Sequence, residues 1–390
     1  MAEAYIVAAG RTAGGRRNGA LAGWHPVEMA AEVLNALVDR SGIDPAAIDD
    51  VIMGCVSQVG EQSFHVGRNA VLASRLPQTV PAVTIDRQCG SSQQALQFAA
   101  QAVMSGTQDI VVAAGVESMT RVPMFTATAL PAREGLGTPF ADRIKARFGV
   151  DEFSQFQGAE MMAEKYGFDR DALDTFALES HQKGAAAIDA GAFDAEIIPL
   201  EVLDAEGVSR RHIHDEGVRR DASLASIGSV RLLREGGRVS AANSSQICDG
   251  SAGLLVVSER ALKQHGLTPL ARIHALAVVA GDPVMMLEEP IPATRKVLGL
   301  AGLGIDDIDL YEVNEAFASM PLAWLQAIGA DPARLNVNGG AIALGHPLGA
   351  SGAKLMATLI YALKARGGRY GLQTICEGGG MANAMIVEAL

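Results

Sequence analysis

The chain has 390 residues, of which 49% are hydrophobic and 19% charged, which suits a globular protein of roughly two or three domains. Its formal net charge of −12 argues against a nucleic-acid-binding surface, since phosphate binding requires basic patches. No run approaches the about 20 apolar residues that span a bilayer, and Met1-Ala2-Glu3 does not open a secretion signal. The four cysteines form neither a metal motif nor a disulfide framework. We therefore expect a cytoplasmic protein with no metal, no nucleic-acid partner and no membrane contact.

Strand-like and helix-like segments alternate through the first 118 residues. Apolar runs at 4–8, 51–53, 83–85 and 109–115 predict strands, and apolar residues at helical spacing from 27 to 37 predict a helix. Such alternation is typical of a parallel sheet covered by helices on both faces.

The strand at 83–85 leads into a turn that contains Cys89, Gly90, Ser91 and Ser92. Apolar residues recur at helical spacing after it: Ala95, Leu96, Ala99, Ala100 and Val103. Cys89 is thus predicted at a helix N-terminus, where the macrodipole lowers a thiol's pKa and favours the nucleophilic thiolate. Gly90 leaves room for a substrate carbonyl. This segment alone fits a buried structural cysteine equally well.

The pattern changes between about residues 118 and 243. Prolines interrupt it, and one long amphipathic helix stands out, from Asp169 past Ala187. Between Arg210 and Arg238 there are seven arginines against four acidic residues, which form either a solvated face or a site for a phosphate-bearing ligand. We interpret residues 119–243 as a loop domain inserted in the first sheet domain and lying over it.

The last third of the chain repeats the first in outline. The segment 46–54 resembles 306–314, because in each a short acidic turn leads into a strand. Cys89 lies 41 positions after Ile48, and His346 lies 38 positions after Ile308, so the two occupy similar places in related halves. We predict a duplicated α/β protein with halves at 1–268 and 269–390.

Polar groups stand at the ends of several strands of the second half. A loop with glycines at 339, 340, 345, 349 and 352 brackets His346, and a strand at 372–375 leads to Cys376 and three glycines. Asn314 closes another strand, where its amide can donate to a water or an oxyanion, and Glu315 could orient a neighbouring group. Open α/β sheets place their chemistry at such strand ends.

Together these motifs resemble the thiolase family, the acyltransferases that make or cleave 3-ketoacyl-CoA. The resemblance covers the whole chain and implies a five-layered α-β-α-β-α core with an inserted loop domain. It implies that Cys89 carries the acyl group as a thioester, that His346 is its base, and that Cys376 is the second acid/base. His346 and a water held by Asn314 would serve the enolate oxygen, and N–H groups of Cys89 and Gly378 the tetrahedral oxygen.

The resemblance also implies how coenzyme A is bound. The segment 240–250 resembles the CoA-contacting turn, with Ser245 at the pantetheine-binding serine. Arg219 matches an arginine near the CoA nucleotide, and Phe317 is the third CoA-binding candidate. CoA and acyl-CoA are expected as substrates, with no tightly bound cofactor. A homotetramer built as a dimer of dimers and a partner subunit for β-oxidation are the expected assemblies.

Two departures from the family pattern concern the substrate. Many members carry His-Met-Gly where this chain has Phe156-Gln157-Gly158, and an apolar residue where it has Glu377. Both favour a degradative thiolase for longer, bulkier or ring-derived acyl chains. A biosynthetic acetoacetyl-CoA thiolase and a non-catalytic acyl-CoA-binding subunit remain alternatives. A decarboxylating ketosynthase would lack the second cysteine that Cys376 provides.

Overall fold

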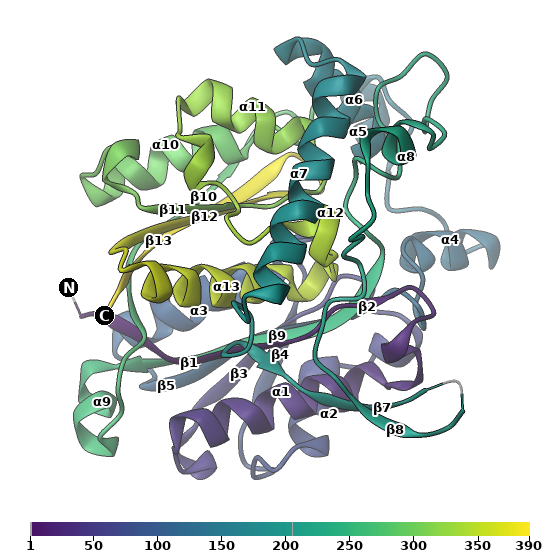
Figure 1. Cartoon of the computed structure of the whole chain (residues 1–390). Helices are drawn as coiled ribbons and strands as arrows, with labels where there is room; N and C mark the ends of the chain where they lie inside the picture. The colour runs from purple at the N-terminus through teal and green to yellow at the C-terminus, as the bar shows by residue number, and fades with distance from the viewer. Residues whose placement is uncertain (1, 205) are drawn as a thin grey trace.

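The computed structural model describes residues 2–204 and 206–390. Two sheets dominate it, with strand orders β4-β3-β5-β9-β1 and β10-β13-β12-β11 (Figure 1). They are joined through β1 and β10, which pair over two positions, Tyr5 with Arg272 and Ile6 with Ala271. The join is short, so each sheet belongs to its own half of the chain.

The first half contains the strands β1 (Ala4–Thr12), β2 (Gly15–Arg16), β3 (Asp50–Gly54), β4 (Ala82–Ile85), β5 (Ile110–Ser118) and β9 (Cys248–Ser258). Its helices are α1 (Pro26–Ser41), α2 (Val66–Ala73), α3 (Ser91–Ser105) and α9 (Glu259–His265). The second half contains β10 (Ala271–Ala280), β11 (Leu310–Val313), β12 (Tyr370–Glu377) and β13 (Met381–Ala389). Its helices are α10 (Pro290–Ala301), α11 (Ser319–Ile328), α12 (Ala341–Leu344) and α13 (Ser351–Arg366).

Helices lie on the outer face of each sheet and between the two sheets. α1 and α2 cover the first sheet, α10 and α11 cover the second, and α3 and α13 fill the layer between them (Figure 1). Both faces of β5 are therefore apolar: Val111 and Ala113 pack toward the central helices, and Val112 and Ala114 pack toward α1. This confirms the predicted five-layered α-β-α-β-α core.

Asp49 and Asp309 make matching hydrogen bonds in the two halves. Asp49 Oδ2 accepts from the two N–H groups at the start of β5, at 2.7 and 3.0 Å. Asp309 Oδ2 accepts from the two N–H groups at the start of β12, at 2.7 and 2.8 Å. A 3-10 turn precedes each aspartate, at Pro45–Ala47 and Ile305–Asp307. The two halves thus share the turn and strand that the sequence predicted and also the hydrogen bonds of this aspartate.

The prediction of a parallel sheet was wrong, because both sheets are mixed. β3 runs parallel to β4 and β5, and β11 runs parallel to β12. However, β9 is antiparallel to β1 and β5, and β13 is antiparallel to β10 and β12. β9 enters from the inserted region and β13 follows β12 through a tight glycine turn, so neither strand needs a helical crossover.

The inserted region holds more regular structure than the sequence indicated. The predicted long helix is present as α7 (Arg170–Asp189), and the side chain of Asp169 accepts from Ala172 N at its start. Its other elements are α4 (Thr126–Arg133), α5 (Asp142–Phe148), α6 (Gln155–Tyr166), α8 (Leu224–Gly228), β6 (Ile197–Ile198), β7 (Leu200–Leu203) and β8 (Ser209–His212). Short helices with interspersed prolines carry too weak a periodic signal to be recognised in advance.

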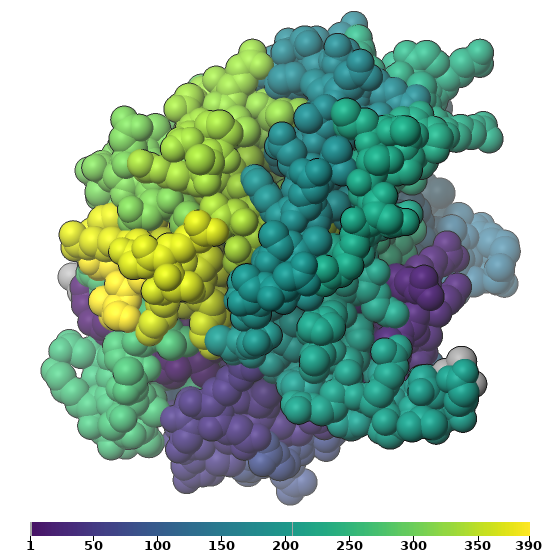
Figure 2. All heavy atoms as spheres, in the orientation of Figure 1, coloured from purple at the N-terminus to yellow at the C-terminus, as the bar shows by residue number. Residues whose placement is uncertain are grey.

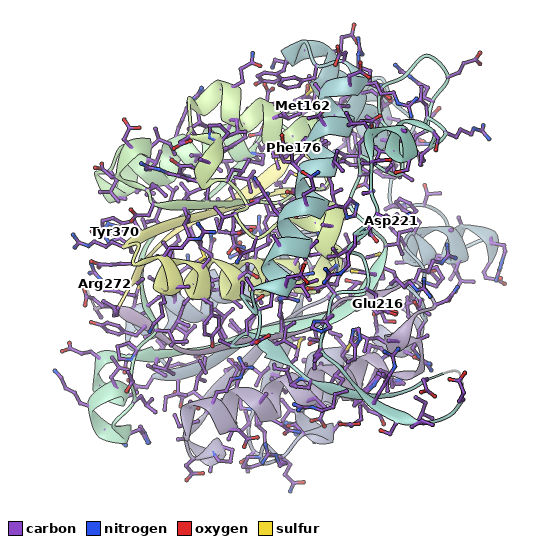
Figure 3. All side chains as sticks on the ribbon, viewed as in Figure 1. Met162, Phe176, Glu216, Asp221, Arg272 and Tyr370 are labelled. Atoms are coloured by element: carbon purple, nitrogen blue, oxygen red, sulfur yellow. The ribbon has the colours of Figure 1, made fainter. Side chains whose placement is uncertain are left out.

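The inserted region also lies over both halves, not over the first alone. Met162 of α6 and Phe176 of α7 belong to the apolar cluster of the second half, whereas Ile198 and Leu200 belong to that of the first. Figure 3 labels Met162 and Phe176 near the second sheet and Glu216 near the first half, where its carboxylate accepts from backbone N–H groups at 2.8 and 3.0 Å. Figure 2 shows the same region crossing the junction of the halves.

Candidate active site

Cys89 lies between β4 and α3, in a turn that its neighbours hold tightly. Gln88 has a φ of +49°, a left-handed conformation that is uncommon for a residue with a side chain. Its N–H donates to Asp86 Oδ1 at 2.6 Å, and the Ser91 hydroxyl donates to Gln88 O at 2.6 Å. The turn therefore keeps the Cys89 thiol, which is only 9% exposed, fixed just before the helix.

The turn that follows Cys376 interlocks with the Cys89 turn. A Cβ on Gly378 would lie 2.9 Å from Gln88 Oε1, and a Cβ on Gly90 would lie 2.0 Å from Glu377 Oε1. Each glycine therefore leaves the space that the other turn occupies. Cys376 ends β12 and is 1% exposed. The structure thus brings a buried thiol from each half together, and Gly378, two positions after Cys376, lies against the turn of Cys89.

Burial raises the pKa of both thiols. It lifts the pKa of Cys89 well above the ordinary value, and the neighbouring Cys376 and Glu377 add to the effect. Burial and Glu377 raise the pKa of Cys376 to about 12. This direction is opposite to the lowering that the helix terminus predicts, because burial disfavours the charged thiolate.

His346 is neutral and presents one nitrogen as a base. Ser351 Oγ donates its only proton to Pro347 O at 2.9 Å, so it accepts from His346 Nδ1–H at 2.6 Å. This fixes the tautomer and leaves Nε2 as an acceptor, 3.4 Å from Asn314 Nδ2. Burial, reinforced by Lys354, lowers the pKa of His346 to about 3.

Two buried charged groups hold the glycine loop that carries His346. The carboxylate of Glu315 accepts from Ser180 Oγ at 2.6 Å, Asn336 Nδ2 at 2.9 Å and Ile342 N at 3.1 Å. Glu315 therefore orients a neighbouring segment, as expected. Lys354 Nζ donates to the carbonyls of the two residues before His346, at 2.5 and 3.2 Å. The loop that carries His346 is thus fixed from both sides.

Two of the three CoA-binding candidates lie together. Ser245 N donates to Ala316 O at 2.9 Å, and Ser244 forms a β-bridge with Phe317. Ser245 therefore lies beside the Asn314 segment. Phe317 is 3% exposed and its ring meets that of Phe156 edge to face, with centroids 5.9 Å apart.

Arg219 is not joined to this group. Its side chain is exposed, and its backbone N–H donates to His181 Nδ1 at 3.2 Å. Among residues 2–204 and 206–390 there is also no group of three histidine, cysteine or acidic side chains that could hold a metal ion. No helix in that part of the chain has the length and apolar character to cross a membrane.

Sequence reasoning missed the roles of Ser351 and Gln88. Ser351 lies five positions after His346, in the glycine loop that the sequence predicted. Nothing in the sequence distinguishes a serine that contacts the imidazole from any other serine of such a loop. The left-handed conformation of Gln88 could not be predicted, because glutamine rarely adopts it.

Family models cover both halves of the chain. The thiolase N-terminal domain matches residues 4–260, and the thiolase C-terminal domain matches residues 267–389. The chain belongs to the thiolase family. It is accordingly an acyltransferase.

Relatives of this thiolase align along its whole length. It is 52% identical to the steroid 3-ketoacyl-CoA thiolase FadA6 of Mycobacterium tuberculosis, over 100% of this chain and 95% of that protein. It is 42% identical to a beta-ketoadipyl-CoA thiolase of Escherichia coli, over 100% of both chains. Among solved structures it matches Bacillus anthracis acetyl-CoA acetyltransferase (TM-score 0.91, 36% identity) and human mitochondrial 3-ketoacyl-CoA thiolase (TM-score 0.89, 34% identity). Each match covers 100% of this chain and 99% of the other.

Proposed function

We propose that this thiolase cleaves 3-ketoacyl-CoA with CoA to acetyl-CoA and a shortened acyl-CoA, through an acyl thioester on Cys89. The observation that carries the proposal is the pair of buried thiols, one from each half, in interlocking turns. A buried structural cysteine needs no second thiol beside it, whereas thiolytic cleavage needs a nucleophile and a separate acid.

Each proton in the proposed reaction has a defined donor and acceptor. Cys89 Sγ bonds to the 3-keto carbon while its proton passes to His346 Nε2. The bond between C2 and C3 then breaks, and the enolate of acetyl-CoA takes its proton from Cys376. In the second half, the thiol of CoA returns a proton to Cys376 and its sulfur displaces Cys89, which recovers its proton from His346.

The raised thiol pKa and the low imidazole pKa make a proton transfer from Cys89 to His346 unfavourable by itself. We infer that the transfer is completed only as the sulfur bonds to carbon, when negative charge moves to the carbonyl oxygen. N–H groups of Cys89 and Gly378 would donate to that oxygen. His346 and a water held by Asn314 would donate to the enolate oxygen. Losing one such donor typically costs roughly 3 kcal/mol in the transition state.

We infer that the acyl group is bulky and apolar. Phe156 is 38% exposed and packs on Phe317 where many family members have a histidine. The segment 281–286 lies between the Phe156 helix and the turn after Cys376. Gly158 of that helix lies against Met285, and Gly380 of that turn lies against Asp282. The name of the relative from Mycobacterium tuberculosis supports ring-derived 3-ketoacyl chains as the class to test first.

Ser245, Phe317 and Arg219 are proposed to contact CoA, the first two near the pantetheine and the third near the nucleotide. CoA and acyl-CoA are substrates in this proposal, with no tightly bound cofactor. A homotetramer, a β-oxidation partner subunit, a cytoplasmic location and domain limits of 1–268 (with the loop domain at about 119–243) and 269–390 stay predictions.

Two measurements test the function. Incubation with acetyl-CoA and intact mass spectrometry should show one acetyl adduct, which is absent from Cys89→Ala; no adduct on the unaltered protein would favour a binding subunit. A thiolysis panel with short, long and ring-bearing 3-ketoacyl-CoA should show the highest kcat/KM for the bulky members. Strict preference for acetoacetyl-CoA would instead favour the biosynthetic activity.

A further inference from the structure

Asn314 lines a small cavity next to the glycine loop of His346. The cavity has room for about one water molecule. Glu312 and Asn314 line it, together with residues of α12 and α13. Both side chains come from the end of β11, two positions apart, so the pleat of the strand brings them to the same face.

Two buried acceptors at this cavity lack a hydrogen-bond donor. Within residues 2–204 and 206–390, neither Glu312 Oε2 nor Asn314 Oδ1 has a partner. Both residues are 1% exposed, and an unsatisfied buried acceptor costs about 1–3 kcal/mol. Such a pair facing one water-sized space is the arrangement that a buried water satisfies.

The other polar side chains that line the cavity donate hydrogen bonds to other acceptors. Ser351 donates to Pro347 O, and Thr358 donates to Glu196 Oε1 at 2.9 Å. Lys354 donates to two carbonyls of the His346 loop and lies 3.7 Å from Asp215. None of the three donates a hydrogen bond to Asn314 Oδ1.

The orientation of the Asn314 amide decides what it offers to the reactive groups. In the structure the Asn314 NH2 faces His346 Nε2, which is an acceptor because Ser351 fixes the imidazole tautomer, and Oδ1 is left without a donor. If the amide turned over, an oxygen would face Nε2 and no donor would remain for a water or an enolate. A donor on the cavity side therefore determines whether Asn314 can work as proposed.

We propose that Glu312 is a positioning residue: it holds one water in this cavity, and that water donates to Asn314 Oδ1 and so keeps the Asn314 NH2 directed at His346. The proposal rests on the function proposed above for Asn314. It assigns to Glu312 no contact with the substrate. A water has two hydrogens, so it can satisfy both acceptors at once.

The charge around Glu312 agrees with this arrangement. Burial raises the pKa of Glu312 well above its usual value, and Glu315 and Glu196 add to the effect, while Lys183 and Arg11 oppose it. Lys354 faces the same cavity. In either protonation state of Glu312, one hydrogen of the bound water remains for Asn314. We therefore expect the neutral isostere glutamine to replace Glu312.

The test compares two variants by two separate assays. Glu312→Leu fills the cavity and removes the water, so thiolysis should fall about 10- to 100-fold, as is typical when a supporting partner of a reactive group is lost. Acetylation of Cys89 by acetyl-CoA should change less than about threefold, because it forms no enolate. Glu312→Gln should keep both rates within about threefold. Equal losses in the two assays, or a fully active Glu312→Leu, would overturn the proposal.

A double variant and a stability control complete the design. Glu312→Leu added to Asn314→Ala should cause no further loss, since both act on the same amide; additive losses would contradict the proposal. Thr294→Val, which removes the acceptor of Trp324 Nε1 at 2.8 Å, controls for a general weakening of the second half. If Glu312→Leu does not fold, Ala341→Val narrows the cavity from another wall and should give the same selective loss. Failure of the unaltered protein to acetylate would refute the proposed function instead.

Discussion

The two halves of this thiolase share a backbone plan but bring different chemistry to it. Asp49 and Asp309 organise the two sheets through the same pairs of hydrogen bonds. The first half then has a complete strand β4 before its helix, whereas the second half keeps a single bridge, between Tyr311 and Leu335, at the equivalent place. Where β4 leads to a tight turn with Cys89, the second half has the long glycine loop with His346.

The difference shows how duplication serves a reaction with two steps. The equivalent central helices α3 and α13 start side by side, since Ala353 N donates to Ser92 Oγ at 2.9 Å, so the segments that precede them reach a common space. A tight turn holds the nucleophile in place. A longer glycine loop carries the imidazole together with Ser351, which holds it. The following experiments test whether the halves are equal in framework and unequal in function, from the largest expected effect to the smallest.

Replacing each thiol in turn should separate the contributions of the halves. Cys89→Ala should abolish both acetylation and thiolysis, because no thioester can form. Cys376→Ala should leave acetylation of Cys89 measurable and abolish thiolysis, because the enolate then lacks its proton donor. Intact mass and steady-state rates measure the two activities. Full turnover by Cys376→Ala would mean that the second half supplies no acid.

Removing the support of the imidazole should have a smaller effect. Ser351→Ala takes away the acceptor that holds His346 Nδ1–H at 2.6 Å, so the ring can turn and change tautomer. We expect kcat to fall about 10- to 100-fold with little change in KM. The matched control is Ser105→Ala at the far end of α3, which should behave as the unaltered protein. An unchanged kcat for Ser351→Ala would show that the glycine loop alone fixes the ring.

The reactivity of Cys89 should depend on pH in a defined direction. Because the pKa of Cys89 is raised, the thiolate is a small fraction at pH 7 and increases about tenfold per pH unit until the raised pKa is reached. Rate constants for alkylation by iodoacetamide should therefore rise from pH 6 to 9 without a plateau. Glu377→Gln should increase the rate a few-fold, since it removes a group that raises the pKa. A plateau below pH 7 would contradict the burial argument.

The framework itself should respond alike in both halves. Asp49→Ala and Asp309→Ala each leave two backbone N–H groups without their acceptor, and each should lower the free energy of unfolding by about 1–2 kcal/mol. Chemical denaturation measures both. Asp204→Ala, in the inserted region, is the control for a partly buried aspartate that accepts backbone hydrogen bonds outside the repeat. Unequal losses of unfolding free energy at positions 49 and 309 would mean that the two halves share the fold of the repeat but not its energetics.

Local sequence determined the reactive residue types and their settings. The apolar run before Cys89, the glycines around His346 and those after Cys376 predicted strand ends and turns, because period and turn chemistry are local properties. The match of Ile48 with Ile308 predicted the repeat for the same reason. These features sufficed to indicate the family.

Tertiary structure alone decided how those residues act on one another. The direction of β9 and β13, the position of the inserted region over both halves and the raised pKa of Cys89 all depend on which faces are buried together. Ser351 gains its role from the way the loop turns its hydroxyl onto His346, Gln88 from one backbone angle, and Glu312 from a cavity lined by α12 and α13. Burial and the satisfaction of hydrogen bonds are properties of the folded whole, and no local pattern encodes them.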